Sequence, residues 1–299
     1  MDSKLKSKFC LRAPAKINLW LKVLGRRPDG YHELDMLMAK IDLYDEMEVE
    51  ETAEGMEIYV DGNDVPCDSS NILWKAWTLL CQASDRSFGL RVLLKKQIPV
   101  AAGLGGGSSD AATLLQGVNQ HLRLGLSSEN LQDLGLKLGA DVPFFLKEGP
   151  QWARGVGEVL SPVQLAPLYI ILLNPQFALS TADVYQWFDQ SPQPPFVKGG
   201  RGGILLTQEN QDATHPTALK EILSNLENDL EKVALPHYPV LATMKERLKV
   251  AGALGVLMSG SGPTVYGIFP SLEARDQGYE FLLKEKDPSW WMIKTMSVE

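Results

Sequence analysis

A glycine-rich segment is the strongest chemical signal in this sequence. Residues 99–110 read Pro-Val-Ala-Ala-Gly-Leu-Gly-Gly-Gly-Ser-Ser-Asp, with four glycines inside 103–107. Glycines let the backbone turn so that successive N–H groups converge, and a following helix N-terminus adds unpaired donors and partial positive charge. We therefore expect this segment to bind a di- or triphosphate, with Ser108 and Ser109 capping the helix or contacting phosphate or magnesium ligands. The alternative is a tight turn that only packs a helix on a strand, for which one or two glycines would suffice.

The residues present also exclude several known nucleotide-binding motifs. The sequence contains no Gly-Lys-Ser/Thr, so the segment is not a P-loop, and Ser108 stands where a dinucleotide fingerprint needs its third glycine. The His-Arg-Asp and Asp-Phe-Gly tripeptides of protein kinases are also absent.

Three further segments carry candidate chemistry. Asp141 lies in Gly-Ala-Asp-Val-Pro-Phe-Phe (139–145), where an isolated acid beside proline is usually a cap or turn residue. Lys16, in Ala-Pro-Ala-Lys-Ile-Asn-Leu (13–19), is the only charge between Arg12 and Lys22, so it either extends to solvent or faces a site. Residues 257–264 form a second glycine loop, which is either a hairpin or a wall of the same site.

The helices and strands that must position these residues are predicted from hydrophobic periodicity and from the Gly, Pro and capping residues that end each segment. Strands are expected at 9–24, 41–57, 88–98, 168–173, 254–269 (interrupted by a loop) and 290–294. Helices are expected at 71–83, 109–122, 128–138, 181–188, 217–233 and 237–250, with one more capped by Ser271. Helices and strands intermix along the chain, and no repeat is visible. The first glycine segment then joins a strand to a helix.

Composition limits the class of protein. The chain has 299 residues, 29 Lys and Arg, 37 Asp and Glu, a net charge of −8 and 44% hydrophobic residues. This is an ordinary globular composition, and the acidic balance argues against a general nucleic-acid binder. Three scattered cysteines (Cys10, Cys67, Cys81) predict reduced thiols rather than a disulfide framework or a four-cysteine zinc site. The longest apolar stretch, 165–173, is about half of a membrane span, so we expect a cytoplasmic protein that binds no membrane.

One segment is typical of an insertion. Residues 191–203 contain three prolines and four glycines, which predicts an exposed, flexible loop near 190–215. Its Lys-Gly-Gly-Arg-Gly-Gly could contact RNA, but a solvated insertion is the better interpretation.

The candidate segments, taken in order, resemble the GHMP kinase superfamily, named for galactokinase, homoserine kinase, mevalonate kinase and phosphomevalonate kinase. The wording of 14–19, 27–32, 105–112 and 139–143 is similar to the 4-diphosphocytidyl-2-C-methyl-D-erythritol kinases within it. The resemblance implies an α+β, two-domain fold. Residues 1–160 would resemble ribosomal protein S5 domain 2 and carry the ATP loop, and 161–299 would be a ferredoxin-like, substrate-side domain.

The resemblance also implies an activity. Such kinases transfer the γ-phosphate of ATP to the 2-hydroxyl of 4-(cytidine 5′-diphospho)-2-C-methyl-D-erythritol in the non-mevalonate route to isoprenoid precursors, with Mg²⁺ carried by the nucleotide. Asp141 would be the general base and Lys16 its cationic partner, and Asn18 would position the reacting groups. Tyr31, His32 and Tyr185 would hold the cytosine end. The implied ATP-binding residues are Asn71, Pro99, Val100, Ala101, Ala102, Gly103, Leu104, Gly105, Gly106, Gly107, Ser108 and Ser109.

Two alternatives stay open. The chain could be another small-molecule kinase of this superfamily, of homoserine or mevalonate kinase type, although Arg-Pro-Asp-Gly-Tyr-His (27–32) belongs with the cytidine-binding enzymes. It could also be a non-catalytic nucleotide-binding protein on the same fold, against which the presence of both Lys16 and Asp141 speaks. We expect a monomer or weak homodimer that binds no nucleic acid.

Overall fold

The computed structural model describes residues 7–62, 65–191 and 218–298, so most of the predicted insertion at 191–203 lies outside the described residues. The chain divides into two compact units whose segments alternate along the sequence. The first unit contains Met1–Ala15, Leu43–Val100 and Gly105–Glu148, and the second contains Lys16–Asp42, Ala101–Leu104 and Gly149–Glu299. Each is described by itself below.

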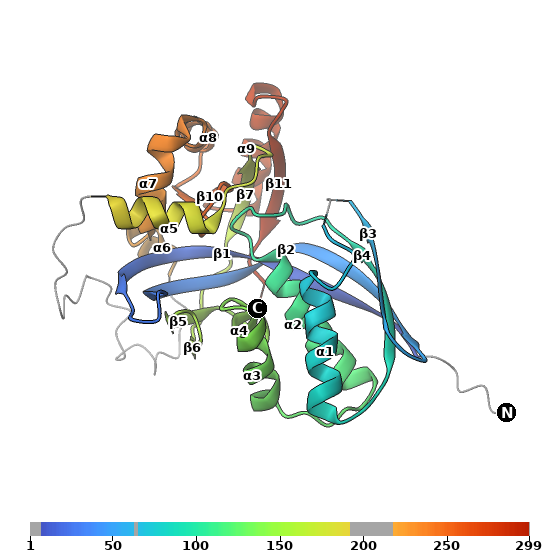
Figure 1. The fold of residues 1–299 in the computed structure, drawn as a ribbon. Coiled ribbons are helices and arrows are strands. Elements are labelled where there is room, and N and C mark those ends of the chain that lie inside the picture. Colours follow the sequence, from blue (N-terminus) through green and yellow to red (C-terminus); the bar gives the residue numbers. More distant parts are fainter. Residues whose placement is uncertain (1–6, 63–64, 192–217, 299) are drawn as a thin grey trace. The chain divides into compact units, whose positions relative to one another are not determined.

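The first unit contains a twisted sheet (Figure 1). Its strands are β1 (Lys8–Arg26) and β2 (His32–Thr52), each of which also continues in the second unit, with β3 (Met56–Asp61) and β4 (Gly89–Lys95). Strand β4 pairs antiparallel with β2 and parallel with β3. Side chains alternate between the two faces of β2, because Met47 and Val49 are fully buried whereas Glu46 and Glu48 are exposed.

Four helices complete the first unit. They are α1 (Ile72–Ser84), α2 (Gly106–His121), α3 (Ser128–Leu138) and α4 (Val142–Phe145), and α2 contacts the other three. Side chains cap two of them: Asn71 accepts from the Leu73 N–H at the start of α1, and Ser127 forms a capping box with Asn130 before α3. The short α4 was not anticipated from the sequence.

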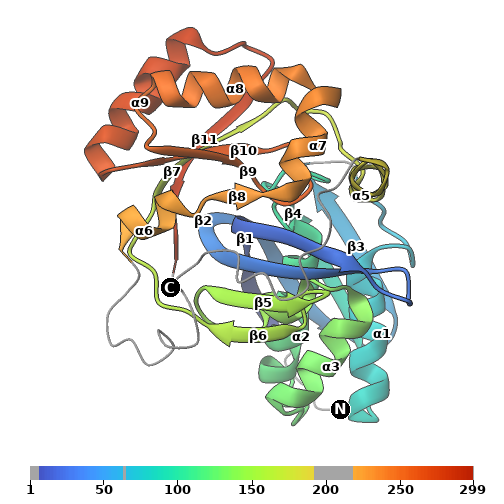
Figure 2. The same ribbon diagram turned by 90° about the vertical axis from the view of Figure 1, so that its left-hand side faces the viewer.

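The second unit contains a four-stranded antiparallel sheet. Its strands are β7 (Tyr169–Asn174), β9 (Gly255–Met258), β10 (Val265–Phe269) and β11 (Trp291–Met296), in the order β11-β7-β10-β9. Helices α8 (Pro239–Val250) and α9 (Leu272–Glu285) pack on this sheet, on the side seen at the top of Figure 2. The strand–helix–strand–strand–helix–strand sequence with this order is the ferredoxin-like arrangement, so that expectation is confirmed.

The remaining elements of the second unit include one correction. Helix α6 (Leu219–Ser224), strand β8 (Glu227–Asn228) and helix α7 (Asp229–His237) occupy the region where a single helix over 217–233 was expected. The helix is interrupted because β8 pairs in parallel with β1 at Trp20 and Leu21, after which Asn228 caps α7. Strands β5 (Gln151–Gly155) and β6 (Val159–Pro162) pair with each other, β5 also pairs with β2, and α5 spans Thr181–Gln190.

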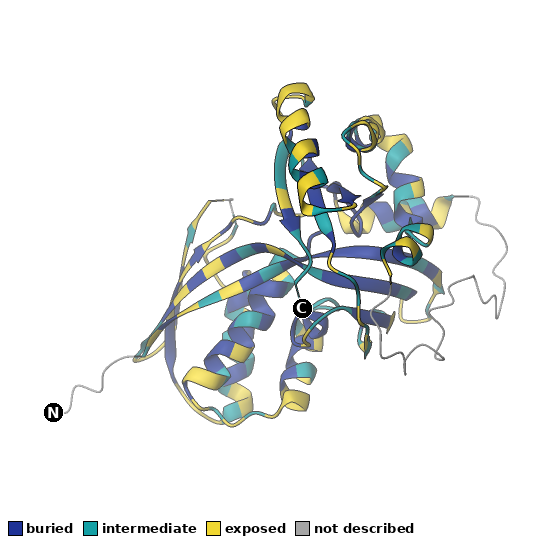
Figure 3. Ribbon diagram, turned by 180° about the vertical axis from the view of Figure 1, so that it is seen from behind, coloured by how far each residue is buried: buried dark blue, intermediate teal, exposed yellow. Residues whose placement is uncertain are grey.

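Each unit has its own apolar core. Figure 3 shows helices with one buried and one exposed stripe, as expected for amphipathic helices covering a sheet. Fully buried large side chains include Met47, Leu73 and Leu90 in the first unit, and Ile17, Met38 and Tyr266 in the second. Lys16 and Asn18 therefore lie on β1 next to core residues such as Ile17 and Leu19.

Candidate active site

The glycine-rich loop connects the end of β4 to the start of α2. Helix α2 begins at Gly106, three residues before the predicted start at Ser109, and its N-cap is Gly105 in the left-handed conformation. No side chain caps this end, so neither Ser108 nor Ser109 has the capping role considered from the sequence. The N–H groups of the first turn consequently have no side-chain acceptor, which suits them to an anion.

The backbone of the loop is unusual in a second respect. Ala101, Gly103 and Gly105 all have positive φ, at 50°, 75° and 71°. Positive φ is costly for alanine, so Ala101 stores strain of the kind found at binding loops. Along the loop, Ala102 and Leu104 are buried whereas Val100 and Gly107 are exposed. Apolar anchors thus hold a loop whose glycine backbone is accessible at the start of α2.

In the second unit, the loop before β10 packs directly against Gly103. The Ser259 hydroxyl donates to the Gly103 carbonyl at 2.9 Å and accepts from the Asn18 N–H at 3.4 Å. A Cβ on Gly103 would lie 2.0 Å from the Ser259 carbonyl oxygen, so only glycine fits there. Residues 257–264 thus form the hairpin between β9 and β10, and this hairpin also contacts the first glycine loop. The two alternatives considered from the sequence are therefore compatible.

Lys16 and Asn18 are buried on β1 beside that contact. The Lys16 ammonium donates to Asn18 Oδ1 at 2.6 Å, and the Asn18 carbonyl accepts from the buried Tyr266 hydroxyl at 2.8 Å. A Cβ on Gly260 would lie 3.2 Å from Lys16 Nζ, so the hairpin also forms a wall next to the ammonium. Lys16 is only 4% exposed, which excludes the solvent-directed alternative for this lysine.

Asp141 is in the first unit, in the turn between α3 and α4. It occupies the N-cap position of α4 but makes no side-chain cap hydrogen bond there, so capping does not explain it. The position for a Cβ on the nearby Gly139 lies 4.0 Å from Ser108 Oγ. The turn that carries Asp141 therefore lies against the first turn of α2, where the glycine loop ends.

Asn71 has a local structural role. Its Oδ1 caps α1 through the Leu73 N–H at 2.9 Å, and its Nδ2 donates to the Pro66 carbonyl at 2.6 Å. The residue thus shapes the turn at 66–71 in the first unit.

The three predicted substrate-side residues belong to the second unit. The His32 ring stacks on Tyr185 of α5, with ring centroids 4.6 Å apart and 21° between their planes. His32 Nε2 lies 2.8 Å from Asp189 Oδ1, and Asp189 also pairs with Arg26 at 3.6 Å. Tyr31 is 64% exposed, which leaves its ring accessible to a ligand.

Comparisons with known proteins identify the family of this chain. Residues 71–149 match the family described as GHMP kinases N terminal domain, and residues 211–288 match GHMP kinases C terminal. The 4-diphosphocytidyl-2-C-methyl-D-erythritol kinase of Citrifermentans bemidjiense is 44% identical over 272 residues, which cover 89% of this chain and 91% of that protein. The protein of that name from Geobacter metallireducens is 43% identical over 288 residues, covering 95% and 96%. This chain belongs to the GHMP kinases, in the branch of the 4-diphosphocytidyl-2-C-methyl-D-erythritol kinases.

Solved structures of this family have the same fold. A crystal structure of a 4-(cytidine 5′-diphospho)-2C-methyl-D-erythritol kinase matches with a TM-score of 0.75 at 34% identity, over 97% of this chain and all of that one. The mevalonate kinase of L. major matches with a TM-score of 0.74 at 18% identity, over 99% and 98%, a likeness that shows the fold alone. As a GHMP kinase, the chain is an ATP-dependent enzyme that phosphorylates a small molecule.

Sequence reasoning did not identify the contacts that support the candidate site. Ser259, Tyr266 and Asn228 hold the Asn18 backbone and the second loop, since Asn228 Nδ2 donates to the Met258 and Gly260 carbonyls at 2.8 Å. Asp189 was also missed, as no signal in the sequence places it beside His32. The one available signal was the Ser-Gly-Ser-Gly run at 259–262, which marked the second loop without identifying its partners.

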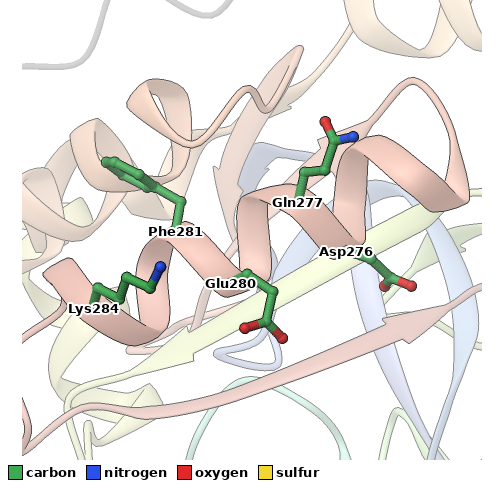
Figure 4. A pocket seen from close by; sticks show the side chains of 5 residues that line it. All are labelled: Asp276, Gln277, Glu280, Phe281 and Lys284. Atoms are coloured by element: carbon green, nitrogen blue, oxygen red, sulfur yellow. The ribbon is translucent and has the colours of Figure 1, made fainter.

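A shallow hollow on α9 contains none of these residues. It is lined by Asp276, Gln277, Glu280, Phe281 and Lys284. Figure 4 shows that their side chains spread along one helix rather than converging on a point, so the hollow offers no site.

Within residues 7–62, 65–191 and 218–298, no three His, Cys, Asp or Glu side chains are arranged to hold a metal ion. In the same part of the chain, no helix is both long and apolar enough to cross a membrane.

Proposed function

We propose that this chain transfers the γ-phosphate of ATP to the 2-hydroxyl of 4-(cytidine 5′-diphospho)-2-C-methyl-D-erythritol, giving the 2-phosphate and ADP. The observation that carries the proposal is the 43–44% identity to kinases of that name, extending over about nine tenths of both chains. The reaction belongs to the non-mevalonate route to isoprenoid precursors. Homoserine and mevalonate kinases share the fold at only 18–19% identity, so they serve as controls rather than as a second candidate.

Asp141 is proposed as the general base. As the 2-hydroxyl oxygen bonds to the γ-phosphorus, its proton passes to the Asp141 carboxylate, and the bond from phosphorus to the β–γ bridging oxygen breaks to release ADP. The support is that the turn carrying Asp141 lies against Ser108, at the end of the glycine loop.

Lys16 and Asn18 are proposed to stabilise charge and to orient the reacting groups. A buried ammonium stabilises negative charge on a phosphoryl group in transfer more strongly than an exposed one, because water screens it less. The hydrogen bond from Lys16 to Asn18, with the Asn18 backbone held by Ser259 and Tyr266, supports a fixed position for both.

The glycine loop is proposed to bind ATP. The uncapped first turn of α2 would receive phosphate oxygens on the N–H groups of Gly106, Gly107 and Ser108, and the remainder of Pro99–Ser109 would enclose the nucleotide. Asn71 would act at the adenine end through the turn that its side chain holds.

Mg²⁺ would enter with the nucleotide. It commonly uses one or two protein oxygens together with phosphates and water, and the described residues contain no three-carboxylate cage. The half-buried hydroxyl of Ser108, at the first turn of α2, fits the protein side of such a site. The ion would neutralise charge on the β- and γ-phosphates.

Tyr31, His32 and Tyr185 are proposed to bind the cytosine end of the substrate. Stacking of a base on an aromatic ring contributes about 1–3 kcal/mol. The accessible Tyr31 ring and the neighbouring His32–Tyr185 stack support this assignment.

The proposal includes the broader setting of the enzyme. Residues 1–160, which contribute segments to both compact units, would carry the nucleotide loop and the catalytic residues, and 161–299 would contribute to the substrate side. The protein would act in the cytoplasm as a monomer or weak homodimer, without nucleic-acid partners.

One assay tests the activity. Purified full-length protein with ATP, Mg²⁺ and the cytidine diphosphate substrate is expected to release ADP in proportion to phosphorylated product. Parallel reactions with homoserine and mevalonate are expected to stay at background. Turnover of either control substrate without turnover of the cytidine compound would overturn the proposal.

A variant tests the role of Asp141. Asp141→Asn removes the proton acceptor but keeps the shape, so we expect kcat to fall by about 10²–10⁴ with ATP binding nearly unchanged. Weakened ATP binding with turnover preserved would assign Asp141 a different role.

A further inference from the structure

A buried cluster of charges in the first unit has no part in the mechanism above. Lys96, the residue after β4, donates from Nζ to Asp110 Oδ2 at 2.8 Å and also to Asp45 Oδ2. The side chains of Asp45, Lys96 and Asp110 are 0%, 4% and 3% exposed. Two carboxylates thus share one ammonium away from water.

The cluster joins the two ends of the glycine-rich loop. Asp45 Oδ1 accepts from the N–H groups of Gln97 and Ile98 at 2.6 and 2.9 Å, and these residues directly precede the loop. Asp110 follows the loop, in the first turns of α2. The Lys96 ammonium therefore connects the chain entering the loop to the chain leaving it.

The cluster also contacts the loop backbone. A Cβ on Gly106 would lie 3.2 Å from Lys96 Nζ and 3.3 Å from Asp45 Oδ2. Gly106 begins α2, so the ammonium and the Asp45 carboxylate lie close to the backbone of that first turn.

We propose that Asp45, Lys96 and Asp110 are positioning residues that hold the two ends of the glycine-rich loop in the geometry that binds the phosphates of ATP. The inference rests on the assignment of this loop to ATP in the proposed function. Their effect is exerted through the backbone at the two ends of the loop.

A purely stabilising role accounts poorly for such a cluster. Removing two charges from water is costly, and well-packed apolar replacements of buried ionic groups are often neutral or stabilising. Hydrogen bonds of fixed direction, in contrast, define the separation of the loop ends, which apolar packing does not.

Four variants separate positioning from stability. Asp110→Leu removes the acceptor on α2 and leaves the Lys96–Asp45 pair intact, so the protein is expected to fold. Asp110→Asn restores an acceptor for Lys96, and Lys96→Met removes the shared donor. Val118→Ala, a fully buried position further along α2, is the matched control for loss of stability.

The measurement is the dissociation constant of ATP by titration calorimetry on the full chain, with the melting temperature of each variant and the KM for ATP. We expect Asp110→Leu and Lys96→Met to weaken ATP binding about 10- to 100-fold, equivalent to about 1.4–2.8 kcal/mol. Asp110→Asn should recover most of the affinity lost in Asp110→Leu. Val118→Ala should lower the melting temperature with ATP affinity retained.

The inference would be overturned if Asp110→Leu bound ATP with wild-type affinity. It would also be overturned if Val118→Ala and Asp110→Leu had the same melting temperature and lost the same amount of ATP affinity. Failure of the proposed function gives a different result, because the wild-type protein would then bind ATP without phosphorylating the cytidine substrate. Gly107→Ala tests the assignment of the loop to ATP separately, because it changes the loop without changing the cluster. If the loop does not bind ATP, this variant would leave ATP affinity unchanged.

Discussion

Two residues of β1, Lys16 and Asn18, are supported by partners that lie far from them in the sequence. Lys16 was notable as a lone charge among apolar strand residues, a local feature. Ser259 bonds to the Asn18 backbone across a separation of 241 residues, and Tyr266 does so across 248. Such contacts depend on tertiary packing, which local pattern does not encode. The same reason hides the link from Lys96 to Asp45, since Asp45 lies in a strand whose neighbouring acids face solvent.

Ser259 provides a prediction about the support of the site. Ser259→Ala removes the hydroxyl that donates to the Gly103 carbonyl and accepts from the Asn18 N–H. Leaving buried polar groups without a partner costs about 1–3 kcal/mol, and the shift of Asn18 and Gly103 should lower kcat/KM about tenfold or more, equivalent to about 1.4 kcal/mol. Denaturant unfolding and steady-state kinetics measure the two effects.

Ser271→Ala is the matched control, because it removes the hydroxyl that caps α9 and should cost about 0.5–2 kcal/mol. Its kcat/KM is expected to stay at the wild-type level, since α9 carries no candidate site residue. An equal loss of activity in both variants would show that Ser259 acts only through stability.

Asp110 predicts a dependence of stability on pH. Burial raises the pKa of Asp110 to about 7, with the Asp45 carboxylate acting in the same direction and Lys96 opposing it. In the unfolded chain an aspartate has a pKa near 3.9. The folded state therefore holds this proton more tightly, and the stability that Asp110 contributes is full below about pH 4 and is lost as pH rises to about 7.

Asp110→Asn does not titrate. Its free energy of unfolding should therefore rise relative to that of the wild type between pH 5 and pH 8, by about 1.4 kcal/mol per pH unit at most. Urea unfolding at both pH values measures this difference, and Asp133→Asn, at an exposed position on α3, is the control. The assignment is refuted by a difference that is constant or that changes in the opposite direction.

At the scale of elements, periodicity predicted most helices and strands, and the errors lie where a backbone contact decides a boundary. Helix α2 was expected to begin at Ser109 because serine favours caps, whereas Gly105 in the left-handed conformation begins it earlier without a side chain. The helix expected over 217–233 is interrupted because β8 pairs with β1, which lies about 200 residues earlier in the sequence.

At the start of α2, one substitution should affect the stability of the fold and the affinity for ATP in opposite directions. Gly107 is exposed, and a Cβ there would have no atom within 4 Å. Gly107→Ala should therefore keep or raise stability, because alanine is the better helix former by about 1 kcal/mol. If phosphates approach the first turn, the same methyl group should weaken ATP binding several-fold. Calorimetric titration with ATP and a thermal melt measure both quantities, and unchanged affinity would remove the loop from the phosphate site.

At the scale of the whole molecule, the alternation of the two units along the chain has a consequence for folding. The chain changes unit after Ala15, Asp42, Val100, Leu104 and Glu148. The glycine loop itself contains two of these changes. Sequence order alone suggests a division near residue 160. Local pattern cannot reveal that residues 16–42 belong to the same compact unit as the C-terminal sheet.

The last prediction concerns a fragment of residues 1–160 expressed alone. Residues 16–42 belong to the second unit, and in the fragment β1 would lose β8, the Asn18 carbonyl would lose the Tyr266 hydroxyl, and Lys22 would lose Glu227. Buried apolar side chains such as Ile17 would also lose part of their cover. Since a domain is stable by only about 5–15 kcal/mol, these losses should leave the fragment without a cooperative thermal transition in circular dichroism. Co-expression with 161–299 is expected to restore that transition together with ATP binding, and a fragment that melts cooperatively by itself would show that the N-terminal part folds independently of the second unit.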